Sequence, residues 1–159
     1  MLACVCVPAV LPSVATGSSR AIAPASPLLW ATIDACESSS VGEIVGVRAS
    51  MPGTGDQTEQ MFMRFSLQYR GSAGRWRKIG GSSALVGVGS AAYASRQGGL
   101  DFQLASGTAP GTPVRGLVTF EWRSGRSVVQ SAQRSTTAGR RPSAGAHPRG
   151  FSAARCTVS

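Results

Sequence analysis

Few side chains in this 159-residue chain could act as acids, bases or nucleophiles. The single histidine, His147, lies in a Gly-Ala-His-Pro stretch typical of a loop, and the sequence has no GxSxG or HExxH pattern. The carboxylates are Asp34, Glu37, Glu43, Asp56, Glu59, Asp101 and Glu121. A nucleophilic Ser or Cys needs a base beside it, and none is evident. We therefore predict no catalytic residue, no cofactor and no enzyme activity.

A pair of carboxylates is the remaining route to catalysis, because glycoside hydrolysis uses two that face each other about 5–10 Å apart. Glu121 lies in the middle of an expected strand, opposite the apolar row, and should face solvent or an arginine such as Arg64 or Arg70. Asp101 alternates away from its apolar neighbours, and neither carboxylate has a candidate partner in the sequence. A hydrolase with an unrecognised carboxylate pair is the third of our functional hypotheses.

The four cysteines fall into two classes. Cys4 and Cys6 lie in an apolar N-terminal run that we expect to be removed, which leaves Cys36 and Cys156. Two cysteines and one histidine cannot complete a tetrahedral zinc site without carboxylates, so we predict no metal site. An even pair in an oxidising compartment predicts one disulfide instead. Because it would enclose nearly the whole domain, the chain-entropy model gives it a stabilisation of about 4–5 kcal/mol.

The N-terminal residues resemble an export signal. Residues 2–11 (LACVCVPAVL) form an apolar run that is too short to span a bilayer as a helix, although no Lys or Arg precedes it. Ala23-Pro24-Ala25 satisfies the A-x-A cleavage rule, and Ser13-Val14-Ala15 is a second candidate. We predict a signal peptide at residues 1–25 and one domain at residues 26–159, secreted or associated with the cell envelope, without a membrane span. The alternative is an apolar tail on a cytosolic protein.

The net charge is +9, and Lys78 is the only lysine. Such a charge could attract a polyanion, although a GC-rich genome would also favour arginine, and the arginines are spread along the chain. The densest basic cluster comprises Arg64, Arg70, Arg75, Arg77 and Lys78, with Tyr69 and Trp76 among them. These residues could bind an anion through charge and stacking. On alternating strands, however, such a set is more typical of a solvated sheet face.

The positions of these residues depend on strands with a repeat of two residues. In Gln60–Arg70, apolar or aromatic side chains at positions 61, 63, 65, 67 and 69 alternate with a second row, which predicts one buried face. Val114–Arg123 and Ser127–Ser135 predict a hairpin across Ser124-Gly125, with Val118, Phe120 and Trp122 on one face.

The remaining elements are shorter. We predict strands at Trp30–Cys36, Glu43–Ser50, Arg75–Ile79, Gly99–Ala105 and Phe151–Val158, a turn or loop at Met51–Gly55, and a loop at Thr136–Gly150, while Ser83–Ala94 could be strand or loop. Glu43–Ser50 should pair with Gln60–Arg70, and Trp76 should pack inward. Seven or eight strands at spacings near ten residues predict an all-β, immunoglobulin-like antiparallel sandwich whose first and last strands are linked by the disulfide.

Four segments carry a resemblance. WATIDAC, QMFMRFSLQ followed by GRW, VTFEWRSGRSVV and the ending GFSAARC are similar to a group of small exported proteins of high-GC Gram-positive bacteria, over about residues 30–158. The resemblance implies an immunoglobulin- or fibronectin-type sandwich without an assigned activity. Val114 departs from the pattern, since an aromatic residue often stands there, and a tyrosine-corner type of lock is therefore not implied.

These observations leave three functional hypotheses. The first is an exported, non-enzymatic binding or structural module of unknown ligand, with another envelope protein or an anionic envelope polymer as its partner. The second is a basic domain that binds anionic wall polymer or extracellular nucleic acid, which an uninterrupted basic stripe on the folded surface would favour. The third is the hydrolase, which two facing carboxylates in a cleft would favour.

Overall fold

The computed structural model describes residues 26–39, 42–104, 109–140 and 145–158, and these contain strands but no helix. The strands are β1 (Trp30–Ser39), β2 (Gly42–Pro52), β3 (Glu59–Arg70), β4 (Trp76–Ser90), β5 (Ser95–Leu104), β6 (Pro113–Ser124), β7 (Ser127–Ser135) and β8 (Cys156–Thr157). The described part of the chain therefore has no helix long and apolar enough to cross a membrane. The predicted signal peptide, residues 1–25, lies outside the described residues.

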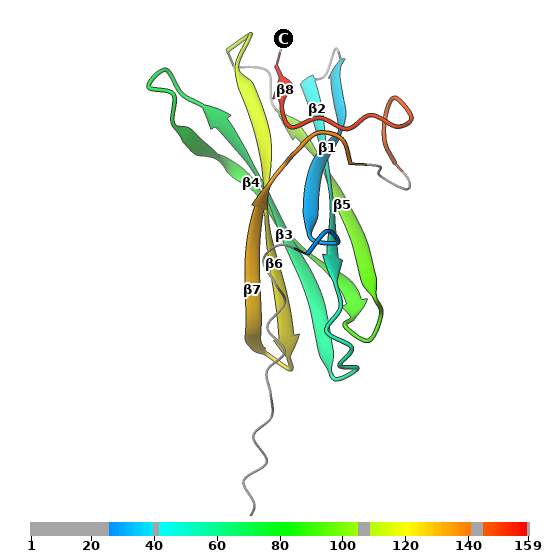
Figure 1. Ribbon diagram of the computed structural model, residues 1–159. Coiled ribbons are helices and arrows are strands. Elements are labelled where there is room, and N and C mark those ends of the chain that lie inside the picture. Colours follow the sequence, from blue (N-terminus) through cyan, green and yellow to red (C-terminus); the bar gives the residue numbers. More distant parts are fainter. Residues whose placement is uncertain (1–25, 40–41, 105–108, 141–144, 159) are drawn as a thin grey trace, which may run out of the picture.

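The strands form two antiparallel sheets that pack face to face (Figure 1). One sheet has three strands in the order β1-β2-β5. The other has five strands, with β4-β3-β6-β7 in a row and β8 paired to β6. The chain crosses between the sheets after β2, β4 and β5. This arrangement is an immunoglobulin-like antiparallel sandwich, and it confirms the fold class that the sequence predicts.

The core lies between the two sheets because successive side chains of a strand point to opposite faces. Its fully buried side chains include Met61, Met63, Phe65 and Leu67 of β3, Val118, Phe120 and Trp122 of β6, and Val45, Val47 and Met51 of β2. The apolar rows predicted on β3 and β6 are thus confirmed. The Trp122 indole also donates a hydrogen bond of 2.9 Å to the Pro52 carbonyl, so a polar contact joins the sheets inside the core.

The predicted neighbour of Gln60–Arg70 is wrong. The segment Glu43–Ser50 belongs to β2, which pairs with β1 and β5, whereas β3 lies between β4 and β6. The turn after β2 therefore carries the chain from one sheet to the other instead of closing a hairpin. Both strands have an apolar row, and placing them in opposite sheets lets these rows pack against each other.

The prediction for Trp76 is also wrong. The β3–β4 hairpin is longer than expected, since β4 includes most of the segment that could have been strand or loop. Near its turn the hairpin extends away from the three-stranded sheet (Figure 1), so that end of β4 has no second layer to pack against. Trp76 is paired in register with the exposed Arg70, and its ring lies under the guanidinium of Arg115, on the outer face of the sheet.

The C-terminal segment returns to β1, as predicted. Its only strand is β8, which is shorter than the expected Phe151–Val158 and pairs with β6. Just before β8, Ile33 and Ala153 exchange two main-chain hydrogen bonds of 2.9 and 3.0 Å. The first strand and the last segment therefore lie side by side.

The predicted disulfide between Cys36 and Cys156 is present, with the two Cα atoms 5.7 Å apart and 120 residues between them in sequence. Cys36 belongs to β1 and Cys156 to β8, so the bond joins the three-stranded sheet to the five-stranded sheet. The preceding segment Thr136–Gly150 forms no strand in its described parts, as expected, and residues 141–144 of it lie outside them. The bond also indicates an oxidising environment outside the cytoplasm.

Candidate anion-binding face

The five basic residues singled out by sequence do not form one cluster. Arg75 and Arg77 lie at the turn of the β3–β4 hairpin. Arg70 and Lys78 are nearby but pair with residues of the outer sheet face, and the Arg70 Nε donates a 3.1 Å hydrogen bond to the Gly74 carbonyl. Arg64 is further along β3, 3.7 Å from Glu121. The sequence cluster is therefore divided among three places.

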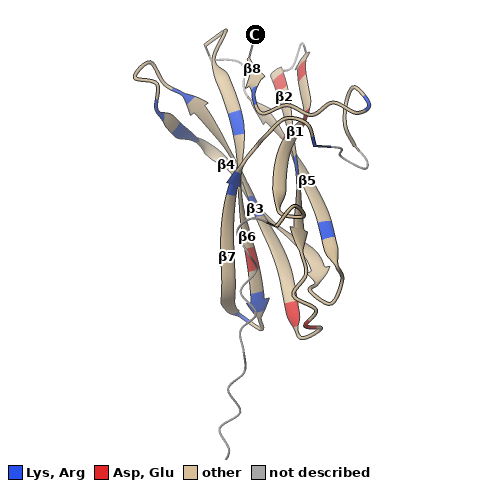
Figure 2. Cartoon of the chain, in the orientation of Figure 1, with Lys and Arg blue, Asp and Glu red and all other residues tan. Residues whose placement is uncertain are grey.

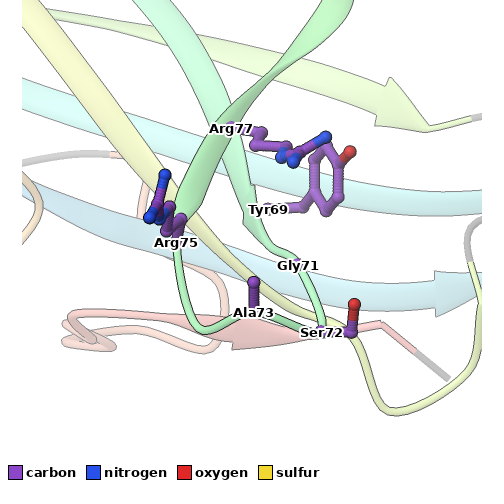
Figure 3. A pocket seen from close by; sticks show the side chains of 6 residues that line it. All are labelled: Tyr69, Gly71, Ser72, Ala73, Arg75 and Arg77. Carbon is purple, nitrogen blue, oxygen red and sulfur yellow. The ribbon is translucent and has the colours of Figure 1, made fainter.

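A pocket of about 190 Å³ lies at the turn of this hairpin. Its lining residues are Tyr69, Gly71, Ser72, Ala73, Arg75 and Arg77. In Figure 3, the side chain of Arg77 lies beside the Tyr69 ring, whereas Arg75 points to the other side of the hairpin. The two arginines therefore do not converge on one ligand position.

A row of cations crosses the outer face of the five-stranded sheet. Gln68 of β3 is paired in register with Lys78 of β4 on one side and with Arg115 of β6 on the other, so the three side chains share one face. Arg155, immediately before β8, lies close enough to Arg115 to affect its ionisation. We call Lys78, Arg115 and Arg155 the basic row. Its three cations come from three distant parts of the chain.

Arg115 is the best-positioned member of the basic row. Its Nε donates a 2.9 Å hydrogen bond to Gln68, and its guanidinium lies 4.3 Å from the centre of the Trp76 ring. Burial, and after it the charge of Arg155, lowers the pKa of Arg115. Neither Arg115 nor Arg155 has an ion-pair partner within the described ranges. The sheet thus places two like charges together without a neutralising acid.

The sequence did not identify Arg115 and Arg155 as site residues, because they are far from the cluster around β3 and β4. Arg155 directly precedes Cys156, and β8 pairs with the residue before Arg115, which is Val114. The disulfide was predictable, but the pairing of β8 with β6 was not. Without that pairing, nothing in the sequence brings these two arginines together.

Other arginines of the same sheet are neutralised by Glu121. As expected, it faces Arg64, but its closer partner is Arg123, whose Nε and Nη2 both donate to it, with Nε at 2.9 Å. Arg123 also lies 4.6 Å from the centre of the Phe62 ring. Glu121 is only 9% exposed, so it faces arginines and not solvent.

Charge differs between the ends of the five-stranded sheet. Figure 2 shows blue bands on β4, on the upper part of β6 and beside β8, whereas the red band of β6 lies toward its other end. The pairings place Lys78 and Arg115 at one level of the sheet and Glu121 at another. The basic row is therefore not interrupted by acidic residues of its own sheet.

The three-stranded sheet contains an ion pair that sequence reasoning missed. Asp34 is 1% exposed, and its Oδ2 accepts a 2.7 Å hydrogen bond from the Nε of Arg48. Burial raises the pKa of Asp34, and the hydrogen bond to Arg48 opposes that effect. Asp101 lacks a candidate partner in the sequence, but in the structure its negative charge also raises the pKa of Asp34. These acids come from different strands, β1 and β5, and the sequence spacing gives no sign of their proximity.

The C-terminal loop packs beside this ion pair. The His147 main-chain N–H donates a 2.8 Å hydrogen bond to the Asp34 carbonyl, and the His147 Nδ1 lies 2.5 Å from a Glu37 oxygen. The imidazole is 74% exposed, which fits a loop histidine. Nowhere in the described ranges do three His, Cys, Asp or Glu side chains come together as a metal site. Asp34 is too buried for its carboxylate to reach a glycosidic bond.

Comparison with known proteins does not assign the chain to a family. No protein-family model matches the chain, and no curated protein matches its sequence.

Proposed function

We propose that this chain is an exported, non-enzymatic binding module that holds an anionic polymer of the cell envelope against the outer face of its five-stranded sheet. The observation that carries the proposal is the basic row, where Arg115 and Arg155 are adjacent and no described acid neutralises them. Placing like charges together costs free energy, which a bound polyanion would offset. The disulfide and the apolar run at residues 2–11 support export.

The environment of the aromatic rings favours recognition of charge over recognition of bases. Proteins that bind single-stranded nucleic acid offer aromatic rings on which bases stack. On this face, Trp76 is covered on one side by Arg115 and Phe62 by Arg123. The rings thus position the guanidinium groups, which makes phosphate or carboxylate groups the better ligands. This reasoning ranks an anionic envelope polymer above extracellular nucleic acid.

The test compares two double variants with equal losses of charge. Arg115→Gln with Arg155→Ser removes two cations from the proposed site. Arg126→Ser with Arg149→Ser removes two exposed arginines from a turn and a loop elsewhere. Binding to inorganic polyphosphate and to poly-glutamate is measured between 50 and 300 mM NaCl. We expect the first variant to bind about tenfold more weakly or worse, with a salt slope smaller by roughly 0.7–0.9 per lost contact.

The second variant should bind within about twofold of the original chain, because long-range attraction between exposed charges is screened at these salt concentrations. Equal losses in both variants would show that only net charge matters and would contradict the proposal. Tighter binding to a mixed-sequence single-stranded oligonucleotide than to either polymer would favour the nucleic-acid alternative instead. Thermal unfolding of each variant shows whether the Arg115 substitution has disturbed the sheet.

A further inference from the structure

Two carboxylates meet on the outer face of the three-stranded sheet, away from the basic row. The register of β1 against β2 shifts between Ile33 and Ala35, which makes Asp34 a bulge residue. A bulge redirects side chains, and here it aims Asp34 across β2. On the other side of β2, Asp101 of β5 is paired in register with Gly46. Asp34 and Asp101 thus approach each other above Gly46.

The absence of a side chain at Gly46 allows this approach. A Cβ atom built on Gly46 would lie 2.7 Å from Asp34 Oδ1, 2.8 Å from Asp101 Oδ1 and 2.9 Å from the Ala35 Cβ. Real Cβ atoms do not come so close to other heavy atoms. The two oxygens converge on one point, so they can be no farther apart than the sum of their distances from it.

One of these oxygens is buried without a partner. Asp34 Oδ1 has no hydrogen bond, although Asp34 is 1% exposed and its Oδ2 is held by Arg48. A buried oxygen of a charged group that makes no hydrogen bond destabilises the fold, because the water it has lost is not replaced by another donor. A bound ion would satisfy such an oxygen. The bond to Arg48 fixes the carboxylate so that its free oxygen faces Asp101.

The charges around the two carboxylates do not balance. Arg48 supplies one positive charge against the two negative charges of Asp34 and Asp101, and its guanidinium lies beside Gly99 and Gly145, over the sheet. Asp101 is exposed, so a hydrated ion can approach from solvent. Hard divalent cations prefer carboxylate oxygens and can keep several of their waters when the protein supplies only two ligands.

We propose that Asp34 and Asp101 bind a divalent cation of the Ca²⁺ type above Gly46. The two Oδ1 atoms supply the protein ligands, and water supplies the others. Affinity should be weak, with a dissociation constant of about 0.1–1 mM, as in extracellular calcium-binding modules. The ion would link β1 to β5 across β2 and would neutralise the buried oxygen. This inference is independent of the basic row and of its polymer.

The experiment titrates the oxidised full-length chain with CaCl₂ and follows both thermal unfolding and the amide NMR signals of Gly46 and Asp101. Matched NaCl controls separate specific binding from ionic strength. We expect saturable shifts of both amide signals and a rise in Tm of about 5 °C at ten times the dissociation constant. Asp101→Asn should weaken binding at least tenfold. The variant should still fold, because Asp101 is exposed.

Asp56→Asn is the matched control, since it removes one exposed aspartate in the turn after β2 and should leave the titration unchanged. A calcium effect that persists in Asp101→Asn would overturn the proposal, as would no saturable effect in the original chain. Stabilisation by Asp101→Asn in the absence of calcium, together with no calcium response in the original chain, would show that the two carboxylates repel each other without binding an ion. That result would also overturn the cation site.

Discussion

The two sheets of the sandwich carry opposite charge and use it differently. The strands of the three-stranded sheet contain Asp34, Glu37, Glu43 and Asp101 against Arg48 and Arg96. The strands of the five-stranded sheet contain Glu59 and Glu121 against Arg64, Arg70, Arg77, Lys78, Arg115, Arg123 and Arg134. The strands of the five-stranded sheet therefore carry an excess of positive charge, and the strands of the three-stranded sheet carry an excess of negative charge.

The two sheets differ in the ion-pair partners of their charged side chains as well as in the sign of their charge. On the three-stranded sheet, Asp34 of β1 is paired with Arg48 of β2, and Glu37 is in contact with His147 of the C-terminal loop. On the five-stranded sheet, Arg115 and Arg155 lack such partners within the described ranges. The paired charges join a strand to a neighbouring strand or loop, and the unpaired charges are the basis of the proposed ligand-binding face.

The largest expected effect comes from removing the disulfide that joins the two sheets. Replacing both Cys36 and Cys156 by Ser removes the bond between β1 and β8. We expect a loss of about 4–5 kcal/mol in the free energy of unfolding, because the bond restrains an enclosed segment of 120 residues in the unfolded chain. Urea unfolding of the variant and of the reduced original chain should give the same lowered midpoint. An unchanged midpoint would show that the core alone holds the sheets together.

A smaller loss should follow from filling the space between the two carboxylates. Gly46→Ala places a Cβ within 2.9 Å of Asp34, Asp101 and Ala35, and we expect it to destabilise the fold by about 1–3 kcal/mol. Gly80→Ala, on β4, is the control from the other sheet, since its Cβ would meet nothing within 4 Å. That variant should stay within about 0.5 kcal/mol of the original chain. Equal effects in urea unfolding would mean that the contact at Gly46 is easily relieved.

The third prediction concerns pH and compares the buried Asp34 with the exposed Asp56. Burial raises the pKa of Asp34 above its usual value of 3.8, so the folded chain holds this proton more tightly than the unfolded chain does. The contribution of Asp34 to stability is therefore full below pH 3.8 and falls as pH rises through its folded pKa. Hydrogen bonds from Thr58 lower the pKa of Asp56, whose contribution is lost as pH falls below 3.8.

Carbon-13 NMR titration of the carboxyl signals measures both groups in one sample. We expect the Asp34 signal to titrate above pH 3.8 and the Asp56 signal to titrate below it. The reverse order would mean that the bond from Arg48 outweighs the burial of Asp34. The stability curve of Asp56→Asn should lose the contribution of Asp56 below pH 3.8 while keeping the contribution of Asp34.

The smallest expected effect comes from making the five-stranded sheet more basic. Glu121→Gln releases Arg64 and Arg123 from their acidic partner, and binding to polyphosphate should strengthen by about two- to fivefold at 50 mM NaCl. Asp101→Asn changes the net charge equally, but on the other sheet, and should alter binding by less than twofold. If both variants strengthened binding equally, the polymer would be responding to total charge and not to one face.

The strands themselves were predictable to a large extent. The alternation in β3 and β6 identified the buried rows correctly, because the pleat of a strand turns a two-residue repeat directly into two faces. The prediction of the disulfide followed from the two cysteines that remain in a domain predicted to be exported. The segment Ser83–Ala94 was ambiguous, because its small residues give no contrast between the two faces. Trp76 was misplaced, because a pattern does not show where the opposite sheet ends.

The candidate sites were much less predictable. Of the basic row, only Lys78 was among the residues that the sequence indicated, since the cluster was chosen by closeness along the chain. Arg115 and Arg155 become neighbours only because β8 pairs with β6. Asp34 and Asp101 meet only because β2 lies between β1 and β5 and has a glycine at the crossing point.

By itself, the sequence determined where most of the strands lie, which side of β3 and β6 is apolar and which cysteines bond. These properties depend on local periodicity and on residue count. Only the tertiary structure decided which strands are neighbours, and thus placed β2 and β3 in opposite sheets. The physical reason is that an apolar row is equally satisfied by any apolar surface it can pack against. Strand pairing depends on the free energy of the whole folded chain. The pairing in turn decides the positions of the unpaired arginines and of the facing carboxylates.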